Sequence, residues 1–334
     1  MPELSAVVPL HNEEGNAREL VARLGRVLGA LDPAHELIVV DDGSTDSTRA
    51  VLRLLAPQQP NLRVLFLSRN FGQEPAVQAG MLRSRGRWVI QLDGDLQHPP
   101  EEIPKLLAKA REGYDVVYGQ RVQRDDPLFR VLASKALVAM MRGLFGVPLP
   151  EDVSTFRVID GALARRVAAL PEKHKFMSAL LSWSGAHSTS IEVRHERRKS
   201  GSSSYGLFRL LSHGLDLLAG FSFRPLRVIG AIGALFALLG TAYAVFKVGQ
   251  KLAGADIQMG YTSLFSAVVI MGSLHLIALS VIGEYVGRIF LQTQGRPNFI
   301  VGEELNAVDE RSHERPAESS SVRARVQSEI GATS

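Results

Sequence analysis

Two long apolar segments in the last third of the chain restrict its fold more than any other feature. They cover residues 226–246 and 262–283. Each is close to the roughly 20 residues that cross the hydrocarbon core of a bilayer as a helix. We therefore expect a transmembrane hairpin at residues 225–288 rather than a buried helical hairpin of a soluble protein. Basic residues flank the first segment, namely Arg224, Arg227, Lys247 and Lys251.

The segments on either side of this hairpin are amphipathic or polar. Residues 201–224 have a broad apolar face, which is typical of an interfacial helix lying on a bilayer. A helix that faces an ordinary protein core remains the alternative. Residues 289–334 are expected to form a cytoplasmic tail that is largely disordered, because the composition is strongly polar from about Asn306. The apolar face comprises Leu207, Phe208, Leu210, Leu211, Leu215, Leu218 and Phe221.

The orientation in the membrane follows from the two spans and the N-terminus. An even number of spans places both termini on the same side. The first residues run directly into a strand-like segment without a basic leader, so no signal peptide is predicted. We therefore expect a multi-pass membrane protein whose N-terminal domain and two termini are cytoplasmic.

The first 200 residues form the expected N-terminal domain, in which short apolar runs alternate with segments of helical periodicity. This alternation favours an α/β domain with a mostly parallel sheet covered by helices on both faces. After about Arg121 the pattern is less regular, with helices expected over Phe129–Phe145 and from Phe176, and an edge strand over Ser190–Val193. The five regular strands are predicted at Leu4–Leu10, Glu36–Val40, Leu62–Leu67, Trp88–Leu92 and Asp115–Tyr118.

Composition excludes several classes of protein. The 334 residues include no cysteine, which excludes disulfides, thiol catalysis and cysteine metal sites. The net charge is only +4, and no basic tract with interleaved aromatics supports nucleic-acid binding. Neither a G-x-x-x-x-G-K-[ST] loop nor a G-x-G-x-x-G turn after the first strand is present, which argues against an NTPase and a dinucleotide oxidoreductase.

One acidic cluster follows the second predicted strand. Asp41 and Asp42 stand at the carboxyl end of that strand, where open parallel sheets bind their ligands. Gly43 allows a tight turn, and a carboxylate at this point can accept hydrogen bonds from a nucleotide base or ribose. A capped turn with solvated acids is the alternative.

A second acidic cluster follows the fourth predicted strand. Asp93 and Asp95 are two residues apart, so their side chains point the same way in an extended chain. Gly94 between them has no side chain to obstruct a ligand. Two hard carboxylates beside a diphosphate suit Mg²⁺ or Mn²⁺, and Gln97 adds a neutral oxygen.

Five segments in order carry a resemblance to a known family. The chain resembles the family 2 glycosyltransferases with a Rossmann-like GT-A fold, and within them the polyprenyl-phosphate glycosyltransferases. That group includes dolichol-phosphate mannose synthase, the bactoprenol glucosyltransferases and the undecaprenyl-phosphate aminoarabinose transferase. The likeness runs from about Ser5 to Pro297 and includes segments 221–227 and 282–288 beside the spans. The five segments are residues 8–14, 40–46, 68–72, 93–100 and 113–117.

The resemblance implies roles for individual residues. It implies a metal site at Asp93, Asp95 and Gln97. It implies a nucleotide site at Pro9, Asn12, Glu13, Asp41, Asp42 and Asp93. The expected grips on the acceptor phosphate are Arg121, Arg130, Ser134, Arg198 and Ser203. The expected catalytic residues are Asp93, Asp95, Arg121, Arg130, Ser134, Arg157 and Arg198.

The sequence departs from the family pattern at three positions, of which Gly94, where alanine is common, is harmless. Thr155 stands where an acid is usual, and Ser204 stands where a lysine is usual. Lys199 is close enough in the sequence to supply the missing charge. The alternative for each of the arginines is an ordinary surface residue.

The resemblance implies an inverting, metal-dependent enzyme of the inner membrane. It would transfer a sugar from a nucleotide sugar to undecaprenyl (polyprenyl) phosphate, with Mg²⁺ or Mn²⁺ as cofactor, and it would form a homo-oligomer. UDP-glucose, GDP-mannose and a UDP-aminopentose remain open as donors. The alternatives are a processive polysaccharide synthase, although no Q-x-x-R-W motif is present, and a non-catalytic membrane anchor or regulator.

Overall fold

Runs of valine, leucine and isoleucine build the centre of an eight-stranded sheet in the computed structural model. The structure describes residues 2–121, 154–172, 176–194, 196 and 261–307, with parts of 233–253. The strand order is β7-β5-β6-β4-β1-β2-β3-β8. The strands are β1 (Leu4–Leu10), β2 (Glu36–Asp41), β3 (Leu62–Leu67), β4 (Trp88–Gln91), β5 (Val116–Arg121), β6 (Arg157–Asp160), β7 (Ser188–Val193) and β8 (Val301–Leu305).

The middle of the sheet is parallel. β1 pairs in parallel with β2 on one side and with β4 on the other, and β2 pairs in parallel with β3. Every residue of β1, β2 and β3 is buried, as expected for strands covered on both faces. β6 lies antiparallel between β4 and β5, and β7 pairs in parallel with β5 at one edge. The expected mostly parallel sheet and the expected edge strand are confirmed.

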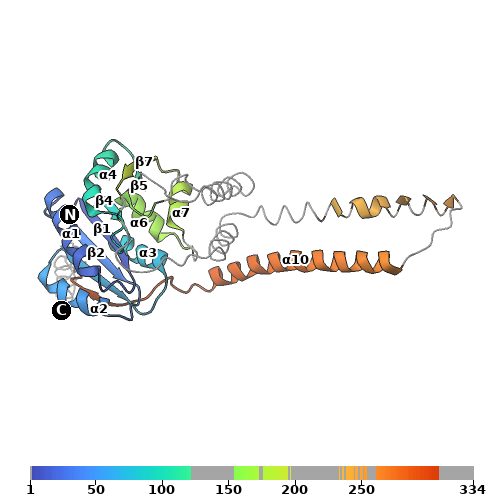
Figure 1. Cartoon of the computed structure of the whole chain (residues 1–334), viewed down its shortest axis with the longest axis horizontal. Coiled ribbons are helices and arrows are strands. Elements are labelled where there is room, and N and C mark those ends of the chain that lie inside the picture. Colours follow the sequence, from blue (N-terminus) through green and yellow to red (C-terminus); the bar gives the residue numbers. More distant parts are fainter. Residues whose placement is uncertain are drawn as a thin grey trace, which may run out of the picture.

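Helices cover both faces of the sheet (Figure 1). One core cluster joins one face to α1 (Ala17–Leu31), α2 (Thr48–Leu55) and α4 (Ile103–Ala110). The other cluster joins the opposite face to α3 (Gln73–Arg83), α6 (Gly161–Ala169) and α7 (Met177–Trp183). The domain therefore has the layered α/β architecture that the sequence predicts. Short 3₁₀ turns, η1 (Ala56–Gln58) and η2 (Pro100–Glu102), precede β3 and α4.

The segment after residue 289 differs from the expected disordered tail. Residues 289–293 continue helix α10 (Tyr261–Thr293), and β8 pairs antiparallel with β3 at the edge of the sheet. Two glutamates of β8 are accommodated because arginines face them. Arg63 hydrogen-bonds to Glu304, and Arg53 Nη2 lies 2.5 Å from Glu303 Oε2. The expectation was wrong for residues 289–305, and residues 308–334 lie outside the described part of the chain.

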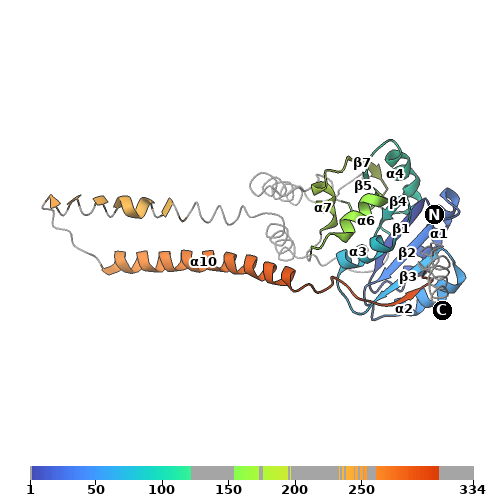
Figure 2. The same cartoon turned by 180° about the vertical axis from the view of Figure 1, so that it is seen from behind.

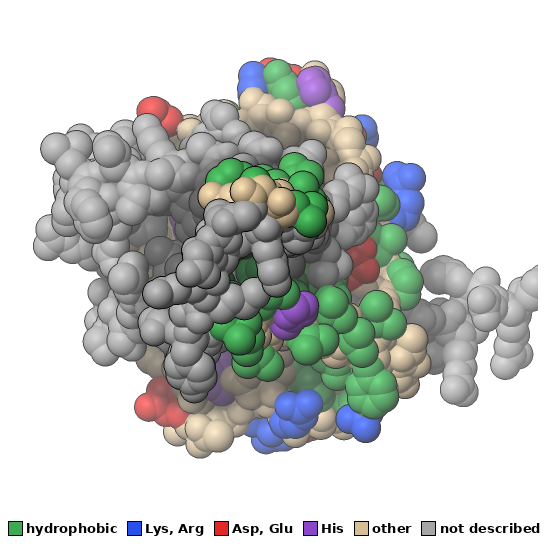
Figure 3. All heavy atoms as spheres, turned by 90° about the vertical axis from the view of Figure 1, so that its right-hand side faces the viewer, with side chains coloured by type: hydrophobic (Ala, Val, Ile, Leu, Met, Phe, Trp, Pro, Cys, Tyr) green, Lys and Arg blue, Asp and Glu red, His purple; other side chains and the backbone are tan. Residues whose placement is uncertain are grey.

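Helix α10 projects away from the α/β domain in both side views (Figures 1 and 2). Within the described residues, its segment Ile270–Thr293 is the one stretch long and apolar enough to cross a membrane, and none of it is buried. Viewed from the far end of the helix, hydrophobic side chains gather over α10 (Figure 3). The predicted span at residues 262–283 is thus helical, and α10 continues beyond it, where Glu284 and Arg288 form an ion pair of 2.8 Å.

Three other expected elements are described only in part or lie outside the described residues. The helix expected at Phe129–Phe145 and the interfacial helix at residues 201–224 lie outside the described residues. The first span at residues 226–246 is described only in fragments, and those fragments are helical.

Candidate active site

Loops at the carboxyl ends of β1, β2, β3 and β4 meet at one edge of the sheet. β1 lies between β2 and β4, and the order of strands along the chain reverses at this point. Such a reversal opens a crevice where ligands of α/β sheets bind. The loops are residues 11–16, 42–47, 68–72 and 92–99, and hydrogen bonds connect them.

Asn12 and Glu13 join the loop after β1 to the loop after β2. Asn12 has a left-handed backbone (φ 55°), and its backbone N–H donates to Ser44 Oγ at 2.9 Å. Its side-chain oxygen accepts a hydrogen bond from the Thr45 backbone N–H at 2.8 Å. The Glu13 backbone N–H donates to Thr48 Oγ1 at 2.9 Å. Pro9 is buried within β1 beneath these loops. These contacts fix the shape of the wall that was predicted to bind a nucleotide.

Asp42 is buried and holds the loop after β3. Its Oδ1 accepts from the Phe71 backbone N–H at 2.7 Å, and its Oδ2 accepts from the Gly72 backbone N–H at 2.8 Å. Both oxygens therefore bond to protein backbone, which fixes this carboxylate rigidly in the crevice wall. The alternative of solvated acids is wrong here, because Asp42 is only 2% exposed.

Asp41 is fully buried behind Asp42. Its Oδ2 accepts from the Ser44 backbone N–H at 3.3 Å and lies 3.0 Å from Nε of Arg49. Burial raises the pKa of the Asp41 carboxyl above its usual value, although Ser44 and the Arg49 charge act in the opposite direction. Asp41 supports the turn from behind and has no exposed surface to offer a ligand.

Asp93 is held from two sides. Gln73 Nε2, in the first turn of α3, donates to Asp93 Oδ1 at 2.6 Å. Thr155 Oγ1, just before β6, donates to Asp93 Oδ2 at 2.6 Å. Burial raises the pKa of Asp93, and the neighbouring charge of Asp95 acts in the same direction. This carboxylate is therefore oriented by two neutral donors from separate elements.

Asp95 and Gln97 complete the predicted metal site. The Gln97 backbone N–H donates to Asp95 Oδ1 at 3.1 Å, which forms a tight turn next to Leu96. Leu96 has a left-handed backbone (φ 59°), a strained conformation that is often found at functional sites. The two carboxylates supply hard oxygen donors of the kind that Mg²⁺ and Mn²⁺ prefer.

The donor set fits a metal that also binds substrate oxygens. Among the described residues, no group of three or more histidine, aspartate or glutamate side chains could hold an ion by itself. Mg²⁺ sites commonly use one or two carboxylates and take further ligands from water and substrate phosphates. Asp93 and Asp95 match that arrangement.

Gly94 has a different role from the one expected. It was expected to leave space for a ligand. A Cβ at Gly94 would instead lie 2.0 Å from Leu10 Cδ2 and 3.1 Å from the Pro9 carbonyl oxygen. Gly94 thus allows the metal-site turn to pack closely on β1, which sets the distance between the two walls of the crevice.

Arg157 was expected to act directly in catalysis, with an ordinary surface residue as the alternative; the surface alternative is wrong, and the catalytic role stays a prediction. It is only 1% exposed. Its Nε and Nη2 donate to Gln91 Oε1 at 2.9 and 2.7 Å, and its Nη1 donates to Ser178 Oγ at 2.7 Å. Burial lowers the pKa of this guanidinium. Arg157 therefore links β6 to β4 and α7 behind the metal site.

Sequence reasoning missed the residues that support the acids. Gln73 contacts Asp93 although it was given no role, and Gln91 and Ser178 hold Arg157. The only signal in the sequence was that Gln73 directly follows the segment Ser68–Gly72 that carries part of the resemblance.

Of the residues predicted to bind the acceptor phosphate, the structure describes only Arg121. Arg121 is the last residue of β5, which places its backbone in the sheet. Arg130, Ser134, Arg198 and Ser203 lie outside the described residues, so their roles stay predictions.

Comparison with known proteins identifies the family of the chain. The model of glycosyl transferase family 2 matches residues 5–169, and the model of the GtrB C-terminal hairpin matches residues 224–289. An uncharacterized glycosyltransferase of Synechocystis sp. is 36% identical over 303 residues, which cover 90% of this chain and 95% of that protein. The chain belongs to glycosyltransferase family 2. The chain is therefore a glycosyltransferase with a GT-A type α/β fold.

Two further relatives have more specific names. The undecaprenyl-phosphate 4-deoxy-4-formamido-L-arabinose transferase of Edwardsiella ictaluri is 33% identical over 89% of this chain and 93% of that protein. The enzyme of the same name from Pseudomonas aeruginosa is 34% identical over 89% of both chains. Glucosyl-3-phosphoglycerate synthase of Mycobacterium tuberculosis resembles the fold, with a TM-score of 0.49 and 19% identity over 67% of this chain and 80% of that chain. The expected membership of the polyprenyl-phosphate group is confirmed by the family 2 domain, the hairpin and these relatives.

Proposed function

We propose that this family 2 glycosyltransferase moves a sugar from a nucleotide-sugar donor to undecaprenyl (polyprenyl) phosphate with inversion. The observation that carries the proposal is the pair Asp93 and Asp95 in the crevice beside β1, on a chain that also has the apolar helix α10. The pair suits a diphosphate donor, and the helix suits an acceptor that is dissolved in a bilayer.

The donor would lie against the wall formed by the loops after β1 and β2. Asn12, Glu13 and Asp42 are fixed there by hydrogen bonds to neighbouring loops, so little ordering is needed when a nucleotide binds. Burial of Asp41 makes it a support for this wall. UDP-glucose, GDP-mannose and a UDP-aminopentose are all compatible with this framework.

Mg²⁺ or Mn²⁺ would be held by Asp93 and Asp95, with Gln97 as the third predicted ligand. When bound, the ion supplies positive charge that offsets the charge developing on the nucleoside diphosphate as it leaves. Gln73 and Thr155 keep Asp93 in a fixed orientation for this task. Arg157 fixes Gln91 at the end of β4, two residues before Asp93.

The acceptor requires little activation. A phosphate monoester is already anionic at neutral pH, so its oxygen can attack the sugar without a strong general base. The predicted grips for this phosphate are Arg121, Arg130, Ser134, Arg198 and Ser203. Confinement of enzyme and lipid to one membrane raises the effective concentration of the acceptor.

The proposal includes an inner-membrane protein with two spans and with the catalytic domain and both termini in the cytoplasm. The matched hairpin and α10 support this arrangement. A homo-oligomer remains a prediction. The product would be a lipid-linked sugar monophosphate for modification of cell-envelope glycans.

A donor panel tests this proposal. Membranes that contain the protein are incubated with labelled UDP-glucose, GDP-mannose or a UDP-aminopentose and added undecaprenyl phosphate, and the lipids are then extracted. The expected result is one labelled lipid that carries a single sugar, formed with one of the donors. A labelled polymer would instead indicate a processive synthase, and an unlabelled lipid with every donor would contradict the proposed acceptor. Membranes without the protein serve as the control.

A further inference from the structure

Trp183 is an exposed tryptophan at the end of α7. Its side chain is 64% exposed, whereas Met177, Leu180 and Leu181 of the same helix are buried. Tryptophan is usually highly buried in folded domains. Outside residues 235–291, the described part of the chain exposes just two other large hydrophobic side chains, Leu54 and Ile300. One exposed apolar residue has no meaning by itself, so the position of Trp183 decides its significance.

Trp183 lies on the same side of the domain as the end of α10. It lines a pocket of about 350 Å³ between α6 and α7 together with Leu170. Leu170 directly precedes Pro171, whose carbonyl oxygen accepts a hydrogen bond of 2.5 Å from Gln292 Nε2 near the end of α10. Both side views show α7 on the side of the domain from which α10 projects (Figures 1 and 2).

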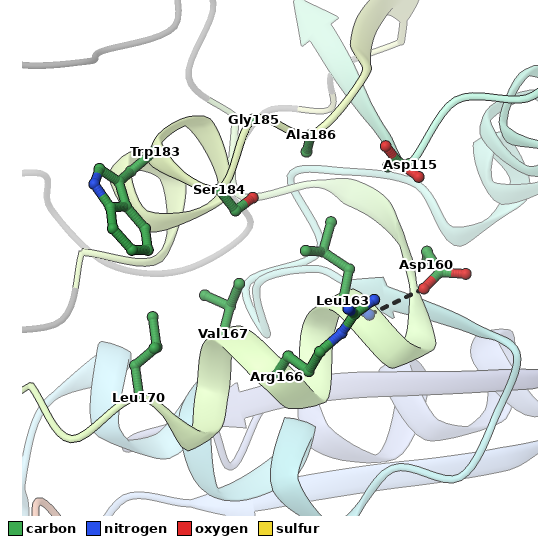
Figure 4. Close-up of a pocket in the computed structure, with 10 residues that line it drawn as sticks. All are labelled: Asp115, Asp160, Leu163, Arg166, Val167, Leu170, Trp183, Ser184, Gly185 and Ala186. Atoms are coloured by element: carbon green, nitrogen blue, oxygen red, sulfur yellow. Dashed lines mark hydrogen bonds between the residues drawn. The ribbon is translucent and has the colours of Figure 1, made fainter.

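The pocket has an apolar end and a polar end. Trp183 and Leu170 lie at one end, and Asp115 and Asp160 lie at the other (Figure 4). Arg166, exposed on α6, also lines the pocket and adds a positive charge. An aromatic ring with an N–H group suits the headgroup region of a bilayer, where tryptophan is enriched.

We propose that the corner of the domain formed by Trp183 and Leu170 docks on the headgroup region of the membrane. The proposal rests on the proposed function, because it takes α10 as a membrane span. The end of α10 is then at the membrane surface, and the contact between Gln292 and Pro171 brings this corner to the same level. Docking of the Trp183 indole gives the domain a second point of contact and limits its rotation about α10. The catalytic crevice is thereby held in one orientation toward the lipid acceptor.

The two tryptophans of the chain make a direct test possible. Trp88 in β4 is only 6% exposed, and its indole nitrogen has no hydrogen-bond partner, so Trp88→Phe removes no hydrogen bond. The full-length Trp88→Phe variant, with Trp183 as its only tryptophan, is reconstituted in phosphatidylglycerol-containing vesicles with and without lipids brominated near the headgroup, and tryptophan is excited selectively. We expect strong quenching by the brominated lipid and weak quenching by aqueous acrylamide. Trp183→Phe, which retains only Trp88, is the matched control and should be quenched by neither.

Two other outcomes of the quenching measurement overturn the proposal. Quenching by acrylamide without quenching by brominated lipid means that Trp183 faces water. Protection from both quenchers means that protein, either another segment or a second copy, covers it. Transfer activity is measured on the same vesicles. Quenching without transfer would contradict the proposed function and leave the docking intact, whereas transfer without quenching would contradict the docking alone.

A kinetic measurement separates docking from a structural role. Trp183→Ala should raise KM for a long-chain lipid acceptor by about three- to tenfold, with kcat and the KM of the donor unchanged. Trp183→Phe keeps an aromatic ring and should therefore raise the acceptor KM less than Trp183→Ala does. Leu54→Ala, which truncates an equally exposed side chain on α2, should leave all three constants unchanged. A loss of kcat with an unchanged acceptor KM would contradict docking.

Discussion

Thr155 donates a hydrogen bond of 2.6 Å to one carboxylate oxygen of Asp93, and Gln73 holds the other oxygen at the same distance. Thr155 therefore orients Asp93 without adding a second negative charge to it. Position 155 usually carries an acid in the proteins that the chain resembles. With a neutral hydroxyl at this position, the proposed metal site would contain fewer carboxylates, which gives a prediction for the metal requirement.

Removal of this hydroxyl should weaken metal use. Thr155→Ala leaves Asp93 with one fixed oxygen, and loss of such a supporting bond typically lowers metal affinity by about 10- to 100-fold. We expect a higher Mg²⁺ or Mn²⁺ concentration for half-maximal transfer, with near-normal activity at saturating metal. Thr155→Ser keeps the hydroxyl and is the control. An unchanged metal requirement in the alanine variant would show that the bond does not position Asp93.

Arg157 should matter for folding more than for contact with substrate. Arg157→Ala would leave the neutral side chains of Gln91 and Ser178 without their buried partner, and an unsatisfied buried polar group costs about 1–3 kcal/mol. We expect a clear fall in the melting temperature of the solubilised protein. Arg157→Lys should not restore it, because lysine lacks the planar fork. A variant that melts normally but fails to transfer sugar would return Arg157 to a direct catalytic role.

Asp41 should give stability a specific dependence on pH. Burial raises its pKa in the folded protein, so the folded state binds the proton more tightly than the unfolded chain. Stability conferred by this group therefore increases as the pH falls through the raised pKa. We compare melting temperatures of the wild type and Asp41→Asn at pH 7.5 and pH 5. From pH 7.5 to pH 5, the melting temperature of the wild type should rise relative to that of the variant. A fall relative to the variant would contradict a raised pKa of Asp41.

Asn306 should hold β8 on the edge of the sheet. Its Nδ2 donates to the carbonyl oxygens of Ala56 and Leu62, each at 2.7 Å, and its backbone is left-handed (φ 54°). Asn306→Ala loses these bonds and keeps the strain, at a cost of about 1–3 kcal/mol. Hydrogen exchange should become faster in residues 301–305 and stay unchanged in β1. Unchanged exchange in β8 would mean that strand pairing alone holds this strand. Asn306→Gly is the control, because it loses the hydrogen bonds but relieves the strain of the left-handed backbone.

The sequence predicted the elements whose pattern is local. The run Leu37–Val40 identifies a buried strand because its residues are apolar without interruption. In β1 and β3 a single residue, Ser5 or Arg63, interrupts an otherwise apolar run. β8 escaped prediction because its two glutamates are paired with Arg53 and Arg63, which lie 250 and 241 residues earlier in the chain. The sequence pattern around β8 does not reveal ion pairs with residues so far away in the chain.

The candidate site was predictable in its acids and not in their supports. Asp93 and Asp95 were recognisable from their spacing after a strand. Gln73 contacts Asp93 only because α3 begins beside the end of β4, which is a consequence of the tertiary fold. Arg157 was interpreted as a site cation because its sequence neighbours do not reveal that it is buried.

The central claim is metal-dependent transfer of a sugar to a polyprenyl phosphate through Asp93 and Asp95. Its most direct test is transfer of labelled sugar to extracted lipid by the wild type and by Asp95→Asn, with Mg²⁺ or Mn²⁺ and with a chelator. We predict one labelled lipid with the wild type and no labelled lipid in the presence of the chelator. Asp95→Asn should reduce the transfer rate by about 100-fold or more. Full transfer in the chelator, or by Asp95→Asn, would contradict the account.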